Sequence, residues 1–199
     1  MIGRMAAVKL ALAQDPKADA LLSKDPFALL IGMVLDQQVP IEWAFRSPYE
    51  LQRRLGGRLD AAEIAAMDPD ALVQAFVQPP ALHRYPAANA KRVQELARIV
   101  VDQYGGKADR IWKTAQDGAE LYKRIKALPG FGERKARIMV ALIGKQLGVR
   151  PPGWEDVAGE FGRPGSYCSV ADITDAESLS RVREYKQEMK AAAKAASRG

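Results

Sequence analysis

The sequence predicts an all-α protein. Apolar residues recur at helical spacing along most of the 199-residue chain, and no segment shows the strict alternation of a half-buried strand. Two apolar segments follow an Asp-Pro pair, in which the aspartate suits a helix cap and the proline suits the first helical position. The composition, 48% hydrophobic and 27% charged, is that of a globular protein and not of a disordered chain or a coiled coil.

The segment 27–38 (FALLIGMVLDQQ) is apolar on nearly all sides, so we expect it to form a central buried helix capped by Asp25. Pro40 should end or bend this helix, and Ser47-Pro48 should begin a new stretch. Further helices are expected, in chain order, over residues 41–45, 49–55, 60–66, 68–77, 87–104, 117–127, 133–147, 154–161 and 176–196.

The chain is long enough to bury one good core. We expect one domain over residues 1–165, followed by a basic helical extension over residues 166–199 that packs on the same domain. Within this extension, Lys186, Lys190 and Lys194 should line one side of the helix, because they are four residues apart.

Cysteine and histidine are rare. Cys168 and His83 are the only residues of their types, which excludes an intrachain disulfide, a cysteine-based zinc site and an iron–sulfur cluster. No run approaches the roughly 18 to 20 apolar residues of a membrane helix. Lys9 interrupts the apolar run near the start, and no cleavage site follows it, which argues against a signal peptide. We therefore expect a cytoplasmic protein without a metal, a cofactor or a membrane partner.

The chain is basic. Thirty Lys and Arg residues against 24 Asp and Glu residues give a net charge of +6 with His83 neutral. A basic protein attracts polyanions, and nucleic acid is the first partner to consider. A solvated surface that happens to be basic would give the same net charge, so the charge indicates nucleic acid only together with a binding motif.

The sharpest motif is LPGFGERKA at residues 128–136. Helical patterns flank a Gly-x-Gly turn, where Gly130 and Gly132 permit a left-handed backbone and a close approach to a ligand. Such a turn presents free N–H groups at the start of the next helix, where an anion is favoured, and Arg134 and Lys135 stand in that first turn. A DNA phosphate suits this site, although a tight turn could need its glycines for geometry alone.

The stretch LPGFGERKA resembles the helix-hairpin-helix motif of DNA repair proteins. About 90 residues upstream, the segment 26–39, which runs from PFALLI to LDQQV, resembles a helix of the helix-hairpin-helix DNA glycosylases, and its Gln-Gln-Val ending is most similar to their alkylbase branch. The resemblance implies two helical lobes flanking a cleft, with the hairpin over residues 121–147. It also implies excision of a damaged or misplaced base from double-stranded DNA, as the first step of base excision repair.

The same resemblance implies which residues meet the nucleic acid. The hairpin residues would bind the sugar–phosphate strand, and the glutamine pair, of which Gln38 matches the family's wedge, would enter the duplex beside the extruded nucleotide. The expected DNA-binding residues are Gly130, Phe131, Gly132, Arg134, Lys135, Gln37 and Gln38. The glutamines could also be plain polar residues at a helix end. A monomer on the DNA of the cytoplasm or nucleoid is expected, with no iron–sulfur cluster and with a monovalent cation at the hairpin as an option.

In the family, a catalytic aspartate follows the basic or aromatic hairpin residue by about 18 to 20 positions. Counting from Arg134 leads to the acids Glu155 and Asp156, and Asp156 is the catalytic candidate that the resemblance implies. The chain departs from the family here, because GWEDVAG differs from the usual Val-Asp-Thr-His. An acid in a first helical turn is also favoured by the helix dipole alone. Asp172 is a weaker alternative, since it lies too far past the hairpin.

Bifunctional members of the family carry a lysine that attacks the sugar and then cuts the strand. The matching position here is Arg134, which stays protonated and cannot act as that nucleophile. We therefore expect a monofunctional enzyme. Lys135, one residue further, should face elsewhere, for example toward a phosphate, and lyase chemistry through Lys135 stays an open alternative.

Recognition of an extruded base needs aromatic faces and a few polar groups. The candidates for this pocket are Glu42, Trp43, His83, Tyr85 and Trp154, for each of which core packing or a loop contact is the alternative. Further basic residues that could contact phosphates are Lys91, Arg92, Arg137, Lys145 and the lysines of the C-terminal segment.

Two other classes of function stay open at this point. One is a non-catalytic DNA-binding protein that uses the hairpin to sense distorted or flipped DNA. The other is a helical interaction protein with a fortuitous hairpin, which would show no salt-dependent affinity for DNA.

Overall fold

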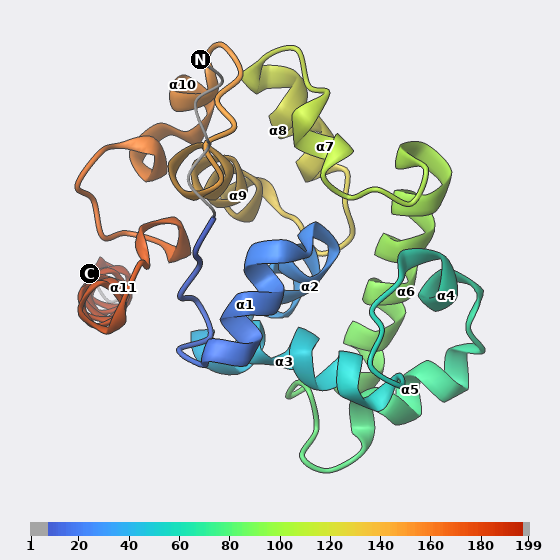
Figure 1. Cartoon of the computed structure of the whole chain (residues 1–199). Helices are drawn as coiled ribbons and strands as arrows, with labels where there is room; N and C mark the ends of the chain where they lie inside the picture. The colour runs from blue at the N-terminus through green and yellow to red at the C-terminus, as the bar shows by residue number, and fades with distance from the viewer. Residues whose placement is uncertain (1–7, 197–199) are drawn as a thin grey trace.

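The structure, a computed structural model, describes residues 8–196, which form eleven α-helices and two short 3₁₀ helices and contain no strand (Figure 1). The prediction of an all-α protein is therefore confirmed. The elements are α1 (Pro16–Lys24), α2 (Pro26–Leu35), α3 (Ile41–Arg54), α4 (Ala61–Ala66), α5 (Pro69–Val77), α6 (Pro86–Tyr104), α7 (Arg110–Lys113), α8 (Gly118–Lys126), α9 (Glu133–Gln146), α10 (Trp154–Ala158), η1 (Gly159–Gly162), η2 (Val170–Asp172) and α11 (Ala176–Ala196). The outer ends of the expected ranges 1–165 and 166–199, and the start of the segment considered as a signal peptide, lie outside the described residues.

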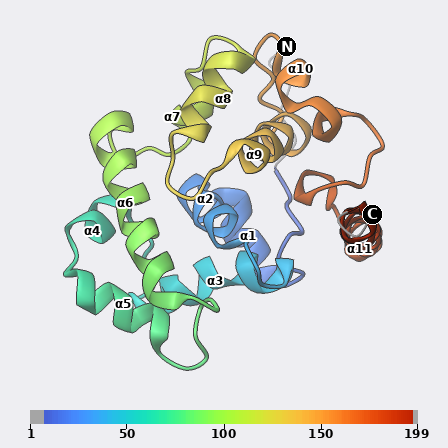
Figure 2. The same cartoon turned by 180° about the vertical axis from the view of Figure 1, so that it is seen from behind.

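Helix α2 lies at the centre of the molecule, as its apolar sequence predicts. Every residue from Phe27 to Leu35 is buried. The carboxylate of Asp25 caps the helix by accepting hydrogen bonds from the backbone N–H groups of Phe27 and Ala28, at 2.9 and 3.2 Å. Both views place α2 between α6 on one side and α9 on the other (Figures 1 and 2). The end of α2 is therefore a place where distant parts of the chain meet.

The remaining helices gather on two sides of this centre. Helices α4 and α5 pack on α6, whereas α8, α10, η1 and η2 pack on α9 (Figure 1). Helices α1 and α3 pack on α2 and on each other between these groups. The buried apolar side chains of all these elements form one continuous cluster, so the groups share a single core.

The boundary at Ser47-Pro48 is not where the sequence predicts it. The segments 41–45 and 49–55 belong to one continuous helix, α3, with Pro48 inside it. Ser47 is buried, and its hydroxyl lies 2.8 Å from the carbonyl oxygens of both Trp43 and Leu82. Tertiary packing of the buried face of α3 therefore outweighs the hydrogen bond that the proline removes.

Three further boundaries differ from the prediction. Helix α2 ends at Leu35, because Asp36 leaves the helical conformation with ψ of 69°, and Gln38 further on has a left-handed backbone with φ of +59°. The segment 154–161 is divided at Gly159, whose φ is also +59°. Helix α1 and the short helix α7 were not expected, although the Asp15 carboxylate caps α1 in the same way that Asp25 caps α2.

The C-terminal segment packs on α9 before it forms α11. The side-chain amide of Gln146 donates to the carbonyl oxygens of Val170, Ala171 and Ile173. In α11, Leu179 and Val182 are buried, and the helix beyond them is largely exposed. Neither this 21-residue helix nor any other in residues 8–196 combines the length and apolarity needed to cross a bilayer.

Candidate nucleic-acid interface

The connection from α8 to α9, residues 127–132, makes a tight turn that descends to the end of α2 (Figure 2). Gly130 has φ of +82°, a left-handed conformation that disfavours any other residue. Helix α9 begins at Glu133, directly after Gly132. Its first backbone hydrogen bond joins the N–H of Ala136 to the carbonyl of Gly132. No side chain of residues 8–196 caps this end. The N–H groups of the first turn are therefore available to an anion in front of the helix.

The turn rests directly on α2 and α6. A methyl group added at Gly130 would lie 3.5 Å from Val34 and 3.9 Å from the Arg92 side chain. Lys135, in the first turn of α9, donates a hydrogen bond from Nζ to the carbonyl of Met33 at 2.8 Å and lies 3.4 Å from that of Val34. These contacts fix the start of α9 against the C-terminal end of α2.

The expectation that Lys135 faces a phosphate is wrong. Its ammonium group points into the protein, because the last carbonyls of α2 have no partner within their own helix and attract a cation. Burial lowers the pKa of Lys135; the Asp36 carboxylate opposes this effect, and the charges of Arg92 and Lys186 reinforce it. The hydrogen bond of Lys135 therefore joins α9 to α2, and its amine is engaged within the protein.

Asp36 is the residue that ends α2, and its backbone N–H bonds to the Gly32 carbonyl. A negative charge is unfavourable at this end of a helix, where the dipole is itself negative. Burial raises the pKa of Asp36, and the positive charges of Lys186 and Lys135 act in the opposite direction. Over residues 8–196 the Asp36 carboxylate forms no hydrogen bond and no ion pair within 4.0 Å.

Gln37 and Gln38 follow in a surface turn that His83 holds in place. The Nε2–H of His83 donates to the Gln37 carbonyl at 2.9 Å. Its Nδ1 accepts hydrogen bonds from the backbone N–H of Tyr85, at 3.0 Å, and from the amide of Asn89, at 2.8 Å. A carbonyl only accepts and a backbone N–H only donates, so His83 is neutral with its proton on Nε2.

His83 is only 2% exposed and does not line a pocket for a base, contrary to the expectation from the sequence. Burial lowers its pKa, the carbonyls of Gln37 and Leu35 act against this, and the charges of Arg92 and Lys135 lower it further. A buried imidazole with both nitrogens engaged is a positioning group. It connects the loop before α6 to the glutamine turn.

The exposed partner of this turn is Tyr85. Its side chain is 48% exposed, and its hydroxyl lies 3.5 Å from the Oε1 of Gln38. The guanidinium of Arg84 lies 5.4 Å from the centre of the Tyr85 ring. An aromatic face, a cation and the amide side chain of Gln38 therefore meet at the surface, a combination that suits nucleic acid.

Of the other expected pocket residues, two are used by the fold. Trp154 is buried against Gly144 of α9. Glu42 forms an ion pair with Arg183 of α11, and its Oε2 atom is buried without a hydrogen-bond partner among the described residues. Trp43 is 39% exposed and available at the surface. Phe131, an expected DNA contact, is only 5% exposed, so its side chain packs in the core and leaves its backbone to the turn.

The structure does not bring Asp156 to the hairpin. The chain from α10 to η1 runs back along α9, with Trp154 packed on Gly144 and Phe161 packed on Arg134, whose guanidinium lies 5.0 Å from the ring centre. The ten positions from Arg134 to Gly144 correspond to about 15 Å of helix. Asp156, two residues beyond Trp154, is exposed. No contact within the described range joins its side chain to the turn.

The sequence did not indicate the residues that stand beside the hairpin in its place. Glu160 and Phe161 line a shallow cavity of about 310 Å³ together with Glu133, Arg134 and Arg137. Glu133 is paired with Arg137 at 3.2 Å. One signal for Asp36 was present: it is the single charged residue in the segment 27–38, at the helix end where a negative charge is unfavourable.

The alternative acid Asp172 has a structural role. Its side chain is 4% exposed and forms an ion pair with Lys145 at 2.6 Å. It also accepts hydrogen bonds from the backbone N–H groups of Cys168 and Ser169. Lys145 is therefore engaged within the protein and is not the phosphate contact that the sequence suggested.

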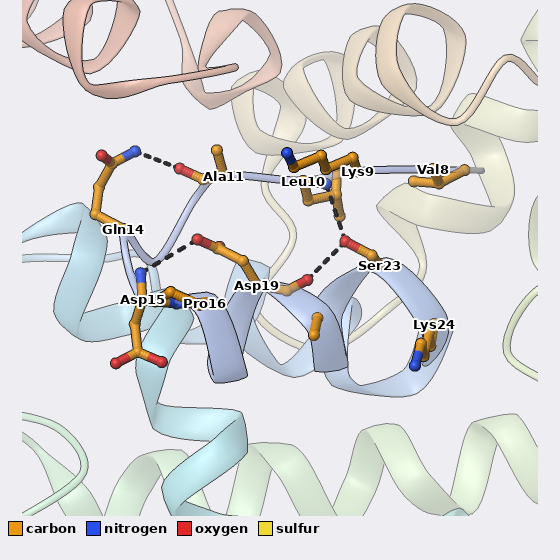
Figure 3. A pocket seen from close by; sticks show the side chains of 11 residues that line it. Val8, Lys9, Leu10, Ala11, Gln14, Asp15, Pro16, Asp19, Ser23 and Lys24 are labelled. Carbon is orange, nitrogen blue, oxygen red and sulfur yellow. Dashed lines mark hydrogen bonds between the residues drawn. The ribbon is translucent and has the colours of Figure 1, made fainter. Parts of the chain in front are cut away.

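A separate cavity of about 660 Å³ lies between residues 8–15 and α1 (Figure 3). Its carboxylate, Asp19, accepts hydrogen bonds from the backbone N–H groups of Ala13 and Asp15, and the Ser23 hydroxyl accepts one from Leu10. The polar groups here hold residues 8–15 against α1. None of the lining residues belongs to the hairpin or to the end of α2.

No protein-family model matches this sequence, and neither does any curated protein. Within residues 8–196, no three His, Cys, Asp or Glu side chains come together in a way that could hold a metal ion. The candidate interface is therefore defined by its own geometry: the turn 127–132, the start of α9, the turn at Gln37 and Gln38, and Asp36 between them.

Proposed function

We propose that the protein is a DNA glycosylase of the helix-hairpin-helix type, which binds double-stranded DNA as a monomer and releases a damaged or misplaced base. The observation that carries this proposal is the docking of the α8–α9 turn on the end of α2 through Gly130 and Lys135. That contact places an open helix N-terminus next to the exposed glutamine turn. The proposal treats α8, the turn and α9 as the helix-hairpin-helix unit and the groups around α6 and α9 as lobes flanking a cleft.

The proposed binding mode follows from the chemistry of these two features. A phosphate bound in front of Gly132 would accept hydrogen bonds from the first turn of α9, which holds the strand regardless of sequence. Gln38, which is exposed and has a left-handed backbone, would then enter the duplex and replace the extruded nucleotide. Extrusion costs a few kcal/mol of unstacking and unpairing, least at a mismatched or damaged base.

The proposed enzyme is monofunctional. A lyase needs a neutral amine close to the sugar, and Arg134 stays protonated. The Lys135 amine donates to the end of α2, and releasing it would leave the Met33 carbonyl without that partner. Hydrolysis of the N-glycosidic bond by water, assisted by a carboxylate, is the chemistry that remains.

One observation favours a second function. The acid expected from the family pattern, Asp156, is exposed on α10 and has no contact with the turn among residues 8–196. A protein with a DNA-binding hairpin and no acid beside it would be a non-catalytic sensor of distorted or flipped DNA. Such a sensor would bind lesion-containing duplexes tightly and leave every base in place.

The experiment that tests the proposal uses the whole protein on duplexes that carry uracil, hypoxanthine, alkylpurine or 8-oxoguanine, followed by hot alkali to cut abasic sites. We expect cleavage at one or more lesions and salt-dependent binding to all duplexes. About five neutralised phosphates would give a slope of log K against log salt near −4.5. Binding without cleavage of any lesion would support the sensor, and a flat salt dependence would contradict both functions.

A further inference from the structure

Asp36 differs from the other acids near the hairpin. Glu133 is paired with Arg137, and Glu160 is exposed on η1. Asp36, by contrast, lies between the Lys135 hydrogen bond to Met33 and the turn at Gln37 and Gln38. Its backbone is fixed by its hydrogen bond to Gly32 at the end of α2. It is the acid closest in sequence to the residue proposed to enter the duplex, with Gln37 alone between them.

The setting of this carboxylate is costly for the fold. It lies at a helix end where a negative charge is unfavourable, it is partly withdrawn from water, and it receives no hydrogen bond from residues 8–196. Two lysines from separate elements, Lys135 of α9 and Lys186 of α11, lie close enough for their charges to act on it. A carboxylate whose lone pairs stay free, with the charges of two lysines acting on it, is arranged to receive a proton or to face a cation.

We infer that Asp36 is the catalytic carboxylate of the glycosylase proposed above, in place of Asp156. In this role its side chain lies against C1′ of the extruded nucleotide, on the side where water attacks. The inference rests on the proposed function, since a protein that releases no base has no use for this acid.

The reaction balances without a cofactor. As the bond between C1′ and the base nitrogen breaks, its electron pair leaves with the base, and the sugar becomes an oxocarbenium ion that the Asp36 carboxylate stabilises. The oxygen of a water molecule then bonds to C1′, and Asp36 takes one proton from that water. Asp36 returns this proton to the departing base, so the products are the free base and an abasic sugar with a hydroxyl at C1′.

The electrostatic surroundings suit such a base. Burial raises the pKa of Asp36, which makes its carboxylate a stronger proton acceptor, and the charges of Lys186 and Lys135 oppose this rise. The charged and titratable groups around it are these two lysines, with Arg92 of α6 and His83 beyond Lys135. Because the ionised form is the active one, turnover should fall as the pH drops through the raised pKa of Asp36.

The first test is Asp36→Asn in the full chain, assayed under single-turnover conditions on the lesion that the wild-type protein cleaves. We expect a loss of about 10²- to 10⁴-fold in the rate of base release, with DNA affinity and melting temperature retained. The matched control is Asp102→Asn, which removes an exposed aspartate near the end of another helix, α6, and should leave the rate unchanged.

The outcomes separate the inference from the function on which it rests. A wild-type protein that releases no base overturns both. An active wild-type protein whose Asp36→Asn variant keeps its rate overturns the inference alone, and loss of activity in Asp156→Asn would then return the role to Asp156. A parallel loss of DNA binding and turnover in Asp36→Asn would show a structural role and would also overturn it.

A second test measures the pH dependence of the rate, which reports the pKa of Asp36, instead of removing Asp36. Lys186 is exposed on α11, so Lys186→Met removes its charge without disturbing the core. The acidic limb of the rate profile should move to higher pH in this variant. Lys190→Met, one turn further along the same helix, removes an equal charge and should leave the limb in place. Equal limbs in Lys186→Met and the wild-type protein would contradict the role of Asp36.

Discussion

The open N-terminus of α9 allows a substitution that should stabilise the fold and weaken DNA binding together. Gly132 has φ of −76° and ψ of 175°, an extended conformation comparable to that of Asp117, which caps α8. A methyl group at Gly132 would meet no atom within 4 Å. An aspartate therefore fits at this position and can accept hydrogen bonds from the first turn of α9. The carboxylate would occupy the place proposed for the phosphate.

Gly132→Asp should raise the stability of the fold and lower the affinity for DNA. An aspartate cap exceeds a glycine cap by a few tenths of a kcal/mol, and its charge on the helix dipole adds about 0.3 to 1 kcal/mol. For a protein of this size we expect a rise of about 1 to 4 °C in melting temperature. Repulsion of a phosphate about 4 Å away amounts to about 1 kcal/mol in water and about 4 kcal/mol in a medium of dielectric near 20. The affinity for DNA should therefore fall by about 5- to 1000-fold.

Fluorescence anisotropy on a labelled duplex at two salt concentrations measures the second effect, and thermal unfolding measures the first. Loss of one phosphate contact should also reduce the steepness of the salt dependence by about 0.9. Gln74→Glu, an exposed position on α5, changes the net charge equally and serves as the control. If Gly132→Asp binds DNA with the affinity and salt dependence of Gln74→Glu, the turn does not hold a phosphate.

Three further predictions concern buried contacts of the fold. Because burial lowers the pKa of His83 below its ordinary value of 6.5, the unfolded chain takes up a proton there before the folded protein does. The stability advantage of the wild-type protein over His83→Gln should therefore shrink as the pH falls below about 6.5, and equal differences in urea unfolding at pH 5 and 7 would contradict this. Gly144→Ala places a methyl group 2.4 Å from the Trp154 ring and should cost about 1 to 3 kcal/mol, seen as a lower melting temperature; an unchanged value would contradict the packing. Lys145→Met should cost about 3 to 5 kcal/mol by leaving the buried Asp172 unpaired, and adding Asp172→Asn should recover most of the loss; a double variant as unstable as the single one would show another cause.

Local chemistry alone determined much of the secondary structure. The Asp25-Pro26 start, the apolar segment after it and the glycines of the 128–136 motif predicted a buried helix and a tight turn, and the structure has both. Local signals failed where packing opposes them. Pro48 lies inside α3 because the buried face of that helix holds it together across the missing hydrogen bond.

The roles of single polar residues were decided by tertiary contacts. From the sequence, Asp156 was the catalytic candidate, Lys135 was an expected contact of the DNA, and Asp36 had no assigned role. The structure turns Lys135 inward because the carbonyls of α2 accept its hydrogen bonds, and it packs Trp154, two residues before Asp156, on Gly144 of α9.

The sequence by itself therefore determined the helical class, the basic charge and the glycine turn, since these depend on propensities within a few residues. Only the tertiary structure decided which acid stands beside the turn and which histidine nitrogen carries the proton. Those properties depend on burial and on charges from elements up to 150 residues apart in the chain, such as Asp36 and Lys186. The mutual effect of Asp36, Lys135 and Lys186 on their charges depends on how close the fold brings them, which no local sequence pattern indicates.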